Sequence, residues 1–351
     1  MSIFDYVFIA PIKLYERWLC SIGNRYKNLD DRSGEEDVMD KIVVITGASA
    51  GLGKCVALEM AKRGAVVVMC CRDLPKANTV VTEIQGIVPD AKLYVIHLDV
   101  SDMDSVRTCA KEIVQKFNCI HILINNAGIA TSHTKPERTS AGYEKHLATN
   151  HLGHMLFTML LLGHLRLGAP SRVVCVGSLL YAFSKLPVDD LNWEKPRTTR
   201  FVSLGPYSDS KRWCMLFAKE LGRRLDGTGI TTYSLCPGLS RTGITSNFSW
   251  FKKIMVFIVI FYVGCTVSQG AGTILYCALA EELAQQTGQA YHFKRIWTRA
   301  NRELLSEDAV KLWKDSEKLL GLSFDKYFPA ISQHKMSGHS TVRMSSMESQ
   351  D

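Results

Sequence analysis

Tyr207 and Lys211 lie four positions apart in a Tyr-Ser-Asp-Ser-Lys segment. On a helix this spacing places both side chains on one face, one turn apart. An ordinary tyrosine has a pKa of about 10 and transfers protons poorly at neutral pH, but a neighbouring ammonium favours the phenolate. Such a tyrosine can give a proton to a carbonyl oxygen or take one from an alcohol. The pair predicts acid–base chemistry at a C–O group, although such pairs also arise by chance on exposed helices.

A glycine-rich turn far upstream makes the chance explanation weaker. Residues 42–45 form a short apolar, β-branched run, as expected of a strand buried on both faces, and a helical stretch begins at about Leu52. Gly47, Gly51 and Gly53 lie between these two elements. Glycines there allow a tight turn and let the backbone approach a pyrophosphate at the helix N-terminus. The Gly-x-x-x-Gly-x-Gly spacing therefore predicts a dinucleotide site.

Strand and helix signals alternate from residue 41 onward. Strands are expected at Ile42–Ile45, Ala65–Cys70, Lys92–Leu98, Ile120–Ile124, Arg172–Val176 and Ile230–Leu235. Helices are expected at about Leu52–Arg63, Pro75–Ile87, Met103–Phe117, Gly142–Leu165 and Tyr207–Leu225. This order predicts an α/β fold with a single doubly wound Rossmann-type parallel sheet and helices on both faces. The motif residues then fall at the carboxyl ends of strands, where such sheets bind ligands.

Composition narrows the class of protein. The 351 residues are 46% hydrophobic and 22% charged, which suits one large globular domain. The net charge of +8 comes without a basic cluster interleaved with aromatics, so no nucleic-acid partner is expected. The excess charge would suit an anionic membrane surface or a phosphate-bearing cofactor, or it is only a soluble surface rich in Lys. Eleven cysteines without a Cys-x-x-Cys pair indicate buried thiols in a reducing compartment and no metal site.

Two apolar segments stand apart from the alternating pattern. Residues 3–19 are apolar and aromatic, but charges interrupt them and no signal-peptide pattern is present, so they are expected to lie on a membrane or to pack as a helix on the domain. Residues 254–263 are ten apolar residues in a row and suit a bilayer interface or a buried element. Neither reaches the roughly 20 residues of a spanning helix. The expected organisation is a membrane-associating segment at 1–28, a polar linker at 29–40, the main domain at 41–330 with a lid at about 239–268, and a disordered tail at 331–351.

Four sequence blocks, in order, carry a resemblance to a known family. They are Thr46-Gly-Ala-Ser-Ala-Gly-Leu-Gly53, Asn125-Asn-Ala-Gly128, Tyr207-Ser-Asp-Ser-Lys211 and Pro237-Gly238. Over about residues 41–300 the chain resembles the short-chain dehydrogenase/reductase superfamily. Finer blocks resemble its retinol dehydrogenase-like branch: Cys71-Arg72-Asp73, Leu98-Asp-Val-Ser101, Asn150-His-Leu-Gly-His154, Asp189-Asp-Leu-Asn-Trp193 and Thr231-Thr-Tyr-Ser234.

The resemblance implies a catalytic set of four residues. Ser178 would polarise the substrate oxygen and Tyr207 would transfer the proton. Lys211 would favour the phenolate and hold the nicotinamide ribose, and Asn150 would order a water in a proton relay. Taken singly, Ser178 also suits a strand-end turn and Asn150 a helix interior. Two departures from the family pattern are the 29 positions between Ser178 and Tyr207, and Gly177 where a second serine is common.

The resemblance also implies a cofactor site at the strand ends. Its residues would be Gly47, Ser49, Gly51, Leu52, Gly53, Arg72, Asp99, Val100, Asn126, Ala127, Gly128, Tyr207, Lys211, Pro237, Gly238 and Thr242. Arg72 follows the second strand, where an Arg accommodates the 2′-phosphate of NADP and an acid takes the ribose hydroxyl of NAD. NADP(H) is therefore expected over NAD(H), unless Asp73 pairs with Arg72 and leaves NAD usable. Asp99 would meet the adenine, or is only a helix N-cap.

The expected function is an NADP(H)-dependent oxidoreductase that interconverts a lipophilic alcohol and its aldehyde or ketone. The apolar segment in the lid indicates a retinoid, steroid or long-chain aldehyde, with reduction favoured in a reducing cytosol. The alternative is a catalytically idle nucleotide-binding or scaffolding protein of the same fold; a structural protein of lipid surfaces is a third. The catalytic domain is expected on a membrane, facing the cytosol, with the endoplasmic reticulum as a candidate and a homodimer left open.

Overall fold

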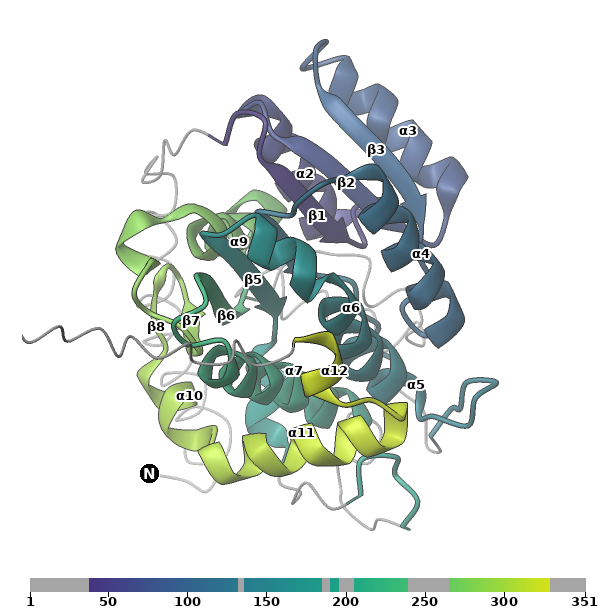
Figure 1. Cartoon of the computed structure of the whole chain (residues 1–351), viewed down its shortest axis with the longest axis vertical. Helices are drawn as coiled ribbons and strands as arrows, with labels where there is room; N and C mark the ends of the chain where they lie inside the picture. Colours follow the sequence, from purple (N-terminus) through teal and green to yellow (C-terminus); the bar gives the residue numbers. More distant parts are fainter. Residues whose placement is uncertain (1–37, 132–135, 185–189, 196–204, 239–264, 329–351) are drawn as a thin grey trace, which may run out of the picture.

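One eight-stranded sheet runs through the part of the chain that the structure describes, in the order β3-β2-β1-β4-β5-β6-β7-β8 (Figure 1). This computed structural model describes residues 38–131, 136–184, 190–195, 205–238 and 265–328. The strands are β1 Ile42–Thr46, β2 Val66–Cys71, β3 Lys92–His97, β4 Ile122–Asn125, β5 Ser171–Val176, β6 Ile230–Cys236, β7 Gln289–His292 and β8 Arg295–Ile296. Neighbouring strands are parallel except the β7–β8 pair. The predicted α/β class and parallel sheet are confirmed, with two strands beyond the six expected.

The strand order reverses at β1. This strand pairs with β2 on one side and with β4 on the other, so that Val44 lies opposite both Val68 and Leu123. The chain builds the sheet outward from this point in both directions. In doubly wound sheets the crevice at such a switch point, outside the carboxyl ends of the strands, is where ligands bind. Thr46 and Asn125 end the two strands at this crevice.

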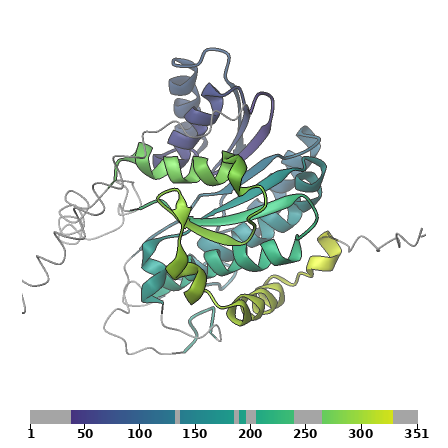
Figure 2. The same ribbon diagram turned by 90° about the vertical axis from the view of Figure 1, so that its left-hand side faces the viewer.

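Helices cover both faces of the sheet (Figure 2). Helices α2, α3 and α9 lie on one face, and α4, α6 and α7 on the other. The helical segments are α2 Gly51–Lys62, α3 Leu74–Gln85, α4 Met103–Lys116, α5 Lys145–Leu147, the π-turn η3 Ala148–Leu152, α6 Gly153–Leu167, the 3-10 turn η4 Leu179–Phe183, α7 Gly205–Arg224, α9 Val267–Leu279, the 3-10 turn η6 Glu281–Leu283, α10 Thr298–Glu303, α11 Ser306–Leu320 and α12 Phe324–Tyr327.

The two helix layers explain why the strand sequences are continuously apolar. On β1, Val43 and Ile45 join the core beneath α2 and α9, whereas Val44 joins the core beneath α4 and α6. All three side chains are fully buried. A parallel strand buried on both faces has no solvent side, so polar residues do not alternate along it.

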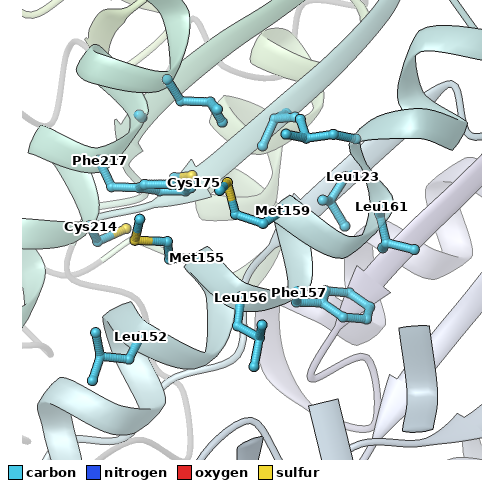
Figure 3. Packing of buried hydrophobic residues seen from close by; sticks show 14 of the residues in the cluster. Leu123, Leu152, Met155, Leu156, Phe157, Met159, Leu161, Cys175, Cys214 and Phe217 are labelled. Atoms are coloured by element: carbon cyan, nitrogen blue, oxygen red, sulfur yellow. The ribbon is translucent and has the colours of Figure 1, made fainter. Parts of the chain in front are cut away.

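Helix α6 is apolar on nearly every side because it is enclosed. Figure 3 shows Met155 and Met159 of this helix in one apolar cluster with Cys175 of β5 and Phe217 of α7. On the outside, α12 packs on α6 and α11 packs on α7, where Phe217 stacks on Trp313 with ring centroids 5.7 Å apart. A helix that is hydrophobic all round is a buried helix. The C-terminal helices therefore complete a core that α6 and α7 alone would leave open.

The single helix predicted over Gly142–Leu165 is wrong in detail. Gly142 has a φ of +82°, a left-handed conformation outside a helix. The helix begins at Lys145, where the Glu144 carboxylate accepts the Leu147 N–H, and it widens into the π-turn before α6. Strands β7 and β8 were not expected because they are short and carry polar residues.

Several predicted segments lie outside the described residues: 1–28, most of the 29–40 linker, 239–264 of the lid and 331–351. The predicted domain limits stay predictions. Val38, in the predicted linker, is 1% exposed and packs in the α2–α9 core, so packing begins before residue 41. Within the described residues, no helix is both long enough and apolar enough to cross a membrane.

We predict opposite effects for two glycine substitutions in α6. A Cβ at Gly153 would lie 1.9 Å from the backbone oxygen of Val100, whereas a Cβ at Gly163 meets nothing within 4 Å. Gly153→Ala should therefore lower the free energy of unfolding by about 1–3 kcal/mol or more through overpacking. Gly163→Ala, the matched control, should raise it by about 0.5–1 kcal/mol. Urea unfolding followed by circular dichroism measures both, and equal effects would contradict the packing of α6 on the β3–α4 connection.

Candidate active site

Tyr207 and Lys211 lie on one face of α7, close to its start. Their residues are 6% and 4% exposed, so both side chains are enclosed. The Lys211 Nζ lies 6.0 Å from the centroid of the Tyr207 ring and donates a 2.8 Å hydrogen bond to the Val176 carbonyl at the end of β5. The strand end thus fixes the ammonium, and the ammonium lies beside the phenol ring.

Asn150 lies in the π-turn and joins this pair through its side chain. Its Oδ1 accepts from the Ile129 N–H at 2.9 Å, and its Nδ2 donates to the Ile129 carbonyl at 3.0 Å and to Ser210 Oγ at 2.9 Å. Ser210 in turn donates to the Tyr207 carbonyl at 2.7 Å. Both amide hydrogens of Asn150 are therefore used to tie the segment after β4 to α7. π-turns inside helices often occur at functional sites.

Gly128 is the point at which two of the predicted catalytic groups meet. A Cβ there would lie 3.2 Å from Asn150 Oδ1 and 3.4 Å from Lys211 Nζ. Any larger residue would crowd both groups. The glycine lets the backbone lie close to an amide oxygen and an ammonium, groups that suit the hydroxyls of a ribose.

Ser178 lies two residues after the end of β5, and its Oγ accepts the Leu180 N–H at 3.2 Å, which starts the 3-10 turn η4. That turn packs on α7. The cap uses the oxygen as an acceptor and leaves the hydroxyl hydrogen to donate, so the turn role and the predicted catalytic role are compatible. A Cβ at Gly177 would lie 2.9 Å from the Leu235 carbonyl and from Met215 Sδ, which explains why a second serine does not occur here.

The glycine-rich turn leads from β1 into α2. Gly47 has a φ of +70°, and a Cβ at Gly53 would lie 2.4 Å from the Gly47 carbonyl, so neither position accepts a larger residue without strain. Ala50 is the N-cap and offers no side-chain bond, and the first turn of α2, with Gly51 and Leu52, carries no acid. Uncapped N–H groups and the positive end of the helix dipole favour an anionic group such as a pyrophosphate.

Thr46 and His154 were not predicted as site residues, yet they connect the turn to the other strand ends. Thr46 Oγ1 accepts the N–H groups of Asn126 at 3.0 Å and Ala127 at 2.9 Å, and it lies 3.0 Å from His154 Nε2. Asn126 Nδ2 donates to the Thr46 carbonyl at 2.8 Å. The His154 ring also bonds the backbone of Asn150. The signals were present, since Thr46 opens the glycine block and His154 is one turn from Asn150.

The directions of these bonds follow from the protonation of His154. Burial lowers the pKa of His154 to about 3, with the positive charge of Lys211 acting in the same direction. The ring is therefore neutral near pH 7 and has one donor and one acceptor nitrogen. With both N–H groups entering the Thr46 oxygen, its hydroxyl hydrogen is left to donate, and two acceptors are in reach: His154 Nε2 at 3.0 Å and the Ile124 carbonyl at 3.4 Å.

At the far end of the crevice, Arg72 and Asp99 lie together. Their closest atoms are 3.9 Å apart, and the Arg72 side chain is 72% exposed. So exposed a pair contributes little to stability, and the guanidinium can exchange it for a phosphate. Asp99 is not a helix N-cap, because Asp102 caps α4, and Asp99 accepts from Ser101 N–H and Oγ instead. Asp73 caps α3 through the Lys76 N–H, so the described contact of Arg72 is with Asp99.

The remaining predicted cofactor residues lie at or beyond other strand ends. Val100 is buried after β3, and Ser49 bonds the Cys71 thiol at the end of β2. Pro237 and Gly238 follow β6, and Cys265 Sγ donates to the Pro237 carbonyl at 3.3 Å, so Cys265 lies beside the end of β6. Thr242 lies outside the described residues.

The described residues at the strand ends have groups suited to bind a nicotinamide dinucleotide. The glycine-rich turn offers uncapped N–H groups to a pyrophosphate, and the backbone at Gly128 lies beside Lys211. Among the residues that the structure describes, no group of three or more His, Cys, Asp or Glu could hold a metal ion. The ten described cysteines are free thiols.

Comparisons with known proteins agree with this arrangement. A family model described as short chain dehydrogenase matches residues 41–186. Retinol dehydrogenase 12 of Mus musculus is 38% identical over 286 residues, covering 81% of this chain and 88% of that protein. Retinol dehydrogenase 11 of Homo sapiens is 39% identical over 289 residues, covering 81% and 87%. A crystal structure of a putative uncharacterized protein from Mycobacterium Paratuberculosis has a TM-score of 0.63 at 30% identity, covering 83% of this chain and 98% of that one. The chain therefore belongs to the short-chain dehydrogenase family of oxidoreductases, in its retinol dehydrogenase-like branch.

Proposed function

We propose that this protein is an NADP(H)-dependent oxidoreductase that interconverts a lipophilic alcohol and its aldehyde or ketone, working in the cell as a reductase. The observation that carries the proposal is that Asn150 and Lys211 meet at the Gly128 backbone, with Tyr207 beside Lys211. A protein that only bound a nucleotide could use the Lys211 ammonium to hold a ribose, but it would have no use for the buried phenol beside it.

The residues suggest a division of labour. When bound, the nicotinamide supplies or accepts the hydride. Negative charge grows on the substrate oxygen during reduction, and the hydroxyls of Ser178 and Tyr207 would stabilise it as donors. Tyr207 would give its proton to that oxygen, and the Lys211 ammonium would balance the phenolate that remains. The Asn150–Ser210 bond would hold α7 in register with the segment after β4.

Turnover by the purified full-length protein tests the proposal. With NADPH we expect reduction of at least one of retinal, a steroid ketone or a long-chain aldehyde. Tyr207→Phe should lower kcat by about 10²–10⁴ because the proton donor is lost, without changing the fluorescence of bound NADPH. Tyr94→Phe, at a 46% exposed tyrosine of β3, is the matched control and should behave as wild type.

Two other outcomes of the same experiment are informative. NADPH binding without turnover of any carbonyl would favour the idle nucleotide-binding or scaffolding alternative. Absence of both turnover and NADPH binding would refute the oxidoreductase proposal.

Arg72 is the basis for the proposed cofactor preference. Its guanidinium is exposed at the end of β2, and Asp73 is occupied as the cap of α3. Arg72→Ala should raise the Kd for NADPH by about 10- to 100-fold, as expected for a lost charge-assisted hydrogen bond, and hardly change that for NADH. Arg302→Ala on α10 is the control. Equal weakening of both cofactors, measured by fluorescence titration, would refute a phosphate contact.

Lipophilic substrates and a membrane location are the finer parts of the proposal. Residues 1–28 and 254–263 lie outside the described residues, and their apolar sequences support contact with a bilayer. Relatives named retinol dehydrogenases support a substrate that partitions into lipid. We place the catalytic domain on the cytosolic side, with the endoplasmic reticulum as the first membrane to examine. Size-exclusion chromatography with light scattering decides whether a homodimer forms. Helix α12 covers α6 and helix α11 covers α7, so a homodimer would have to form through another face of the domain.

Deletion of residues 1–28 tests the membrane contact. The full chain should sediment with membranes from lysed cells, and the shortened chain should move to the supernatant while keeping NADPH binding. A shortened chain that still sediments assigns the contact to another segment, with 254–263 the next to replace. A full chain found only in the supernatant would refute membrane association.

A further inference from the structure

A buried carboxylate–imidazole pair lies behind the catalytic tyrosine, outside the predicted site. Glu144 is 1% exposed and His146 is 4% exposed, and Glu144 Oε1 lies 2.8 Å from His146 Nδ1. The other carboxylate oxygen accepts the Leu147 N–H at 2.7 Å. On the far side of the ring, His146 Nε2 accepts the Thr131 N–H at 3.0 Å, with the Thr131 hydroxyl 3.1 Å away.

These partners select one tautomer of His146. A backbone N–H can only donate, so Nε2 must carry a lone pair toward Thr131. The single ring proton of a neutral His146 is then on Nδ1 and is donated to Glu144. A carboxylate that holds a histidine through Nδ1–H fixes both the tautomer and the direction of the ring. A proton on Nε2 would face another N–H and break the contact with Thr131.

The fixed ring contacts the catalytic tyrosine. His146 and Tyr207 have ring centroids 6.1 Å apart at an interplanar angle of 70°, an edge-to-face arrangement. The ammonium of Lys211 also lies 6.0 Å from the centroid of the Tyr207 ring. The phenol ring thus contacts an imidazole from α5 and an ammonium from its own helix.

The same pair also holds the backbone that leads away from Gly128. Thr131 is two residues beyond Ile129, whose N–H and carbonyl bind the Asn150 side chain, and His146 is four residues before Asn150. The Glu144 N–H donates to Asn192 Oδ1 at 2.7 Å, so the segment 190–195 is tied to the pair as well. The buried Glu144–His146 pair therefore connects the segment after β4, the start of α5 and the ring of Tyr207.

We propose that His146, fixed in the Nδ1–H tautomer by Glu144, is a positioning residue that directs the phenol of Tyr207 and holds the 128–131 segment against it. The inference rests on the proposed role of Tyr207 as proton donor. Small displacements of a reacting group lower rates steeply, so losing this support should reduce kcat more than the affinity for NADPH.

Two substitutions separate the ring contact from the hydrogen bonds. His146→Phe keeps an aromatic edge against Tyr207 but has neither nitrogen, and His146→Gln keeps a donor and an acceptor but has no ring. His164→Gln, on α6 and without a part in the pair, is the control. We expect kcat to fall by at least about tenfold in both His146 variants, with the NADPH Kd changed by less than about threefold and the control unchanged.

A spectroscopic measurement tests the positioning without any turnover. The ring-carbon resonance of Tyr207, assigned with Tyr207→Phe in protein labelled at tyrosine, should shift in both His146 variants and not in His164→Gln. Nitrogen spectra of the histidines should show an Nδ1–H tautomer that disappears in both His146 variants and becomes mixed in Glu144→Ala. These spectra test the positioning role even if no carbonyl substrate is found. Failure to find a substrate would count against the proposed function alone.

The results that overturn the inference are equally definite. An Nε2–H tautomer would contradict the hydrogen-bond assignment. An unshifted Tyr207 resonance, with kcat, NADPH affinity and Tm falling together, would make His146 structural only. Wild-type kcat in both variants would exclude any positioning role.

Discussion

The hydrogen bonds made by the Thr46 hydroxyl are the interactions on which the rest of the site depends. The hydroxyl is fully buried at the end of β1, it accepts two N–H groups from the turn after β4, and it lies against the ring of His154. A buried oxygen with this many partners is costly to disturb, because each partner would be left without a hydrogen bond. The glycine turn, the Asn126–Gly128 edge and the π-turn with Asn150 are thereby held in one arrangement at the switch point of the sheet.

Buried polar groups are concentrated on the side of the sheet where the strands end. Asn150, Ser210, Lys211 and His146 are nearly inaccessible, and each has a partner from a different element, while the equally buried Glu144 pairs with His146 of the helix it caps. Polar groups in a medium of low dielectric constant interact strongly and tolerate little displacement. Such a network can keep a phenol and an ammonium aligned through a catalytic cycle. The apolar core around α6 supplies the rigid base, and the C-terminal helices α11 and α12 seal it.

Much of the fold was predictable from local pattern. The first six strands and the helices between them were recognised because continuous apolar runs, glycine turns and helical periodicity are local properties. Strands β7 and β8 were missed because Gln289–His292 has no such pattern and is a strand through its pairing with β6 and β8. The π-turn was missed for a similar reason: Asn150 leaves the regular helix because its side chain bonds Ile129 and Ser210, which are distant in sequence.

The sequence by itself determined the class of fold, the family and the residue types of the proposed cofactor site, because spacing along strands and helices dictates which side chains share an edge or a face. Tertiary structure alone decided what those residues do for one another. Asp73 caps α3, whereas Asp99 caps no helix. Gly177 has no room for a serine side chain. Glu144 and His146 support the ring of Tyr207. Hydrogen bonds between residues far apart in the chain set these roles, and no local pattern records which partner a buried polar group will find.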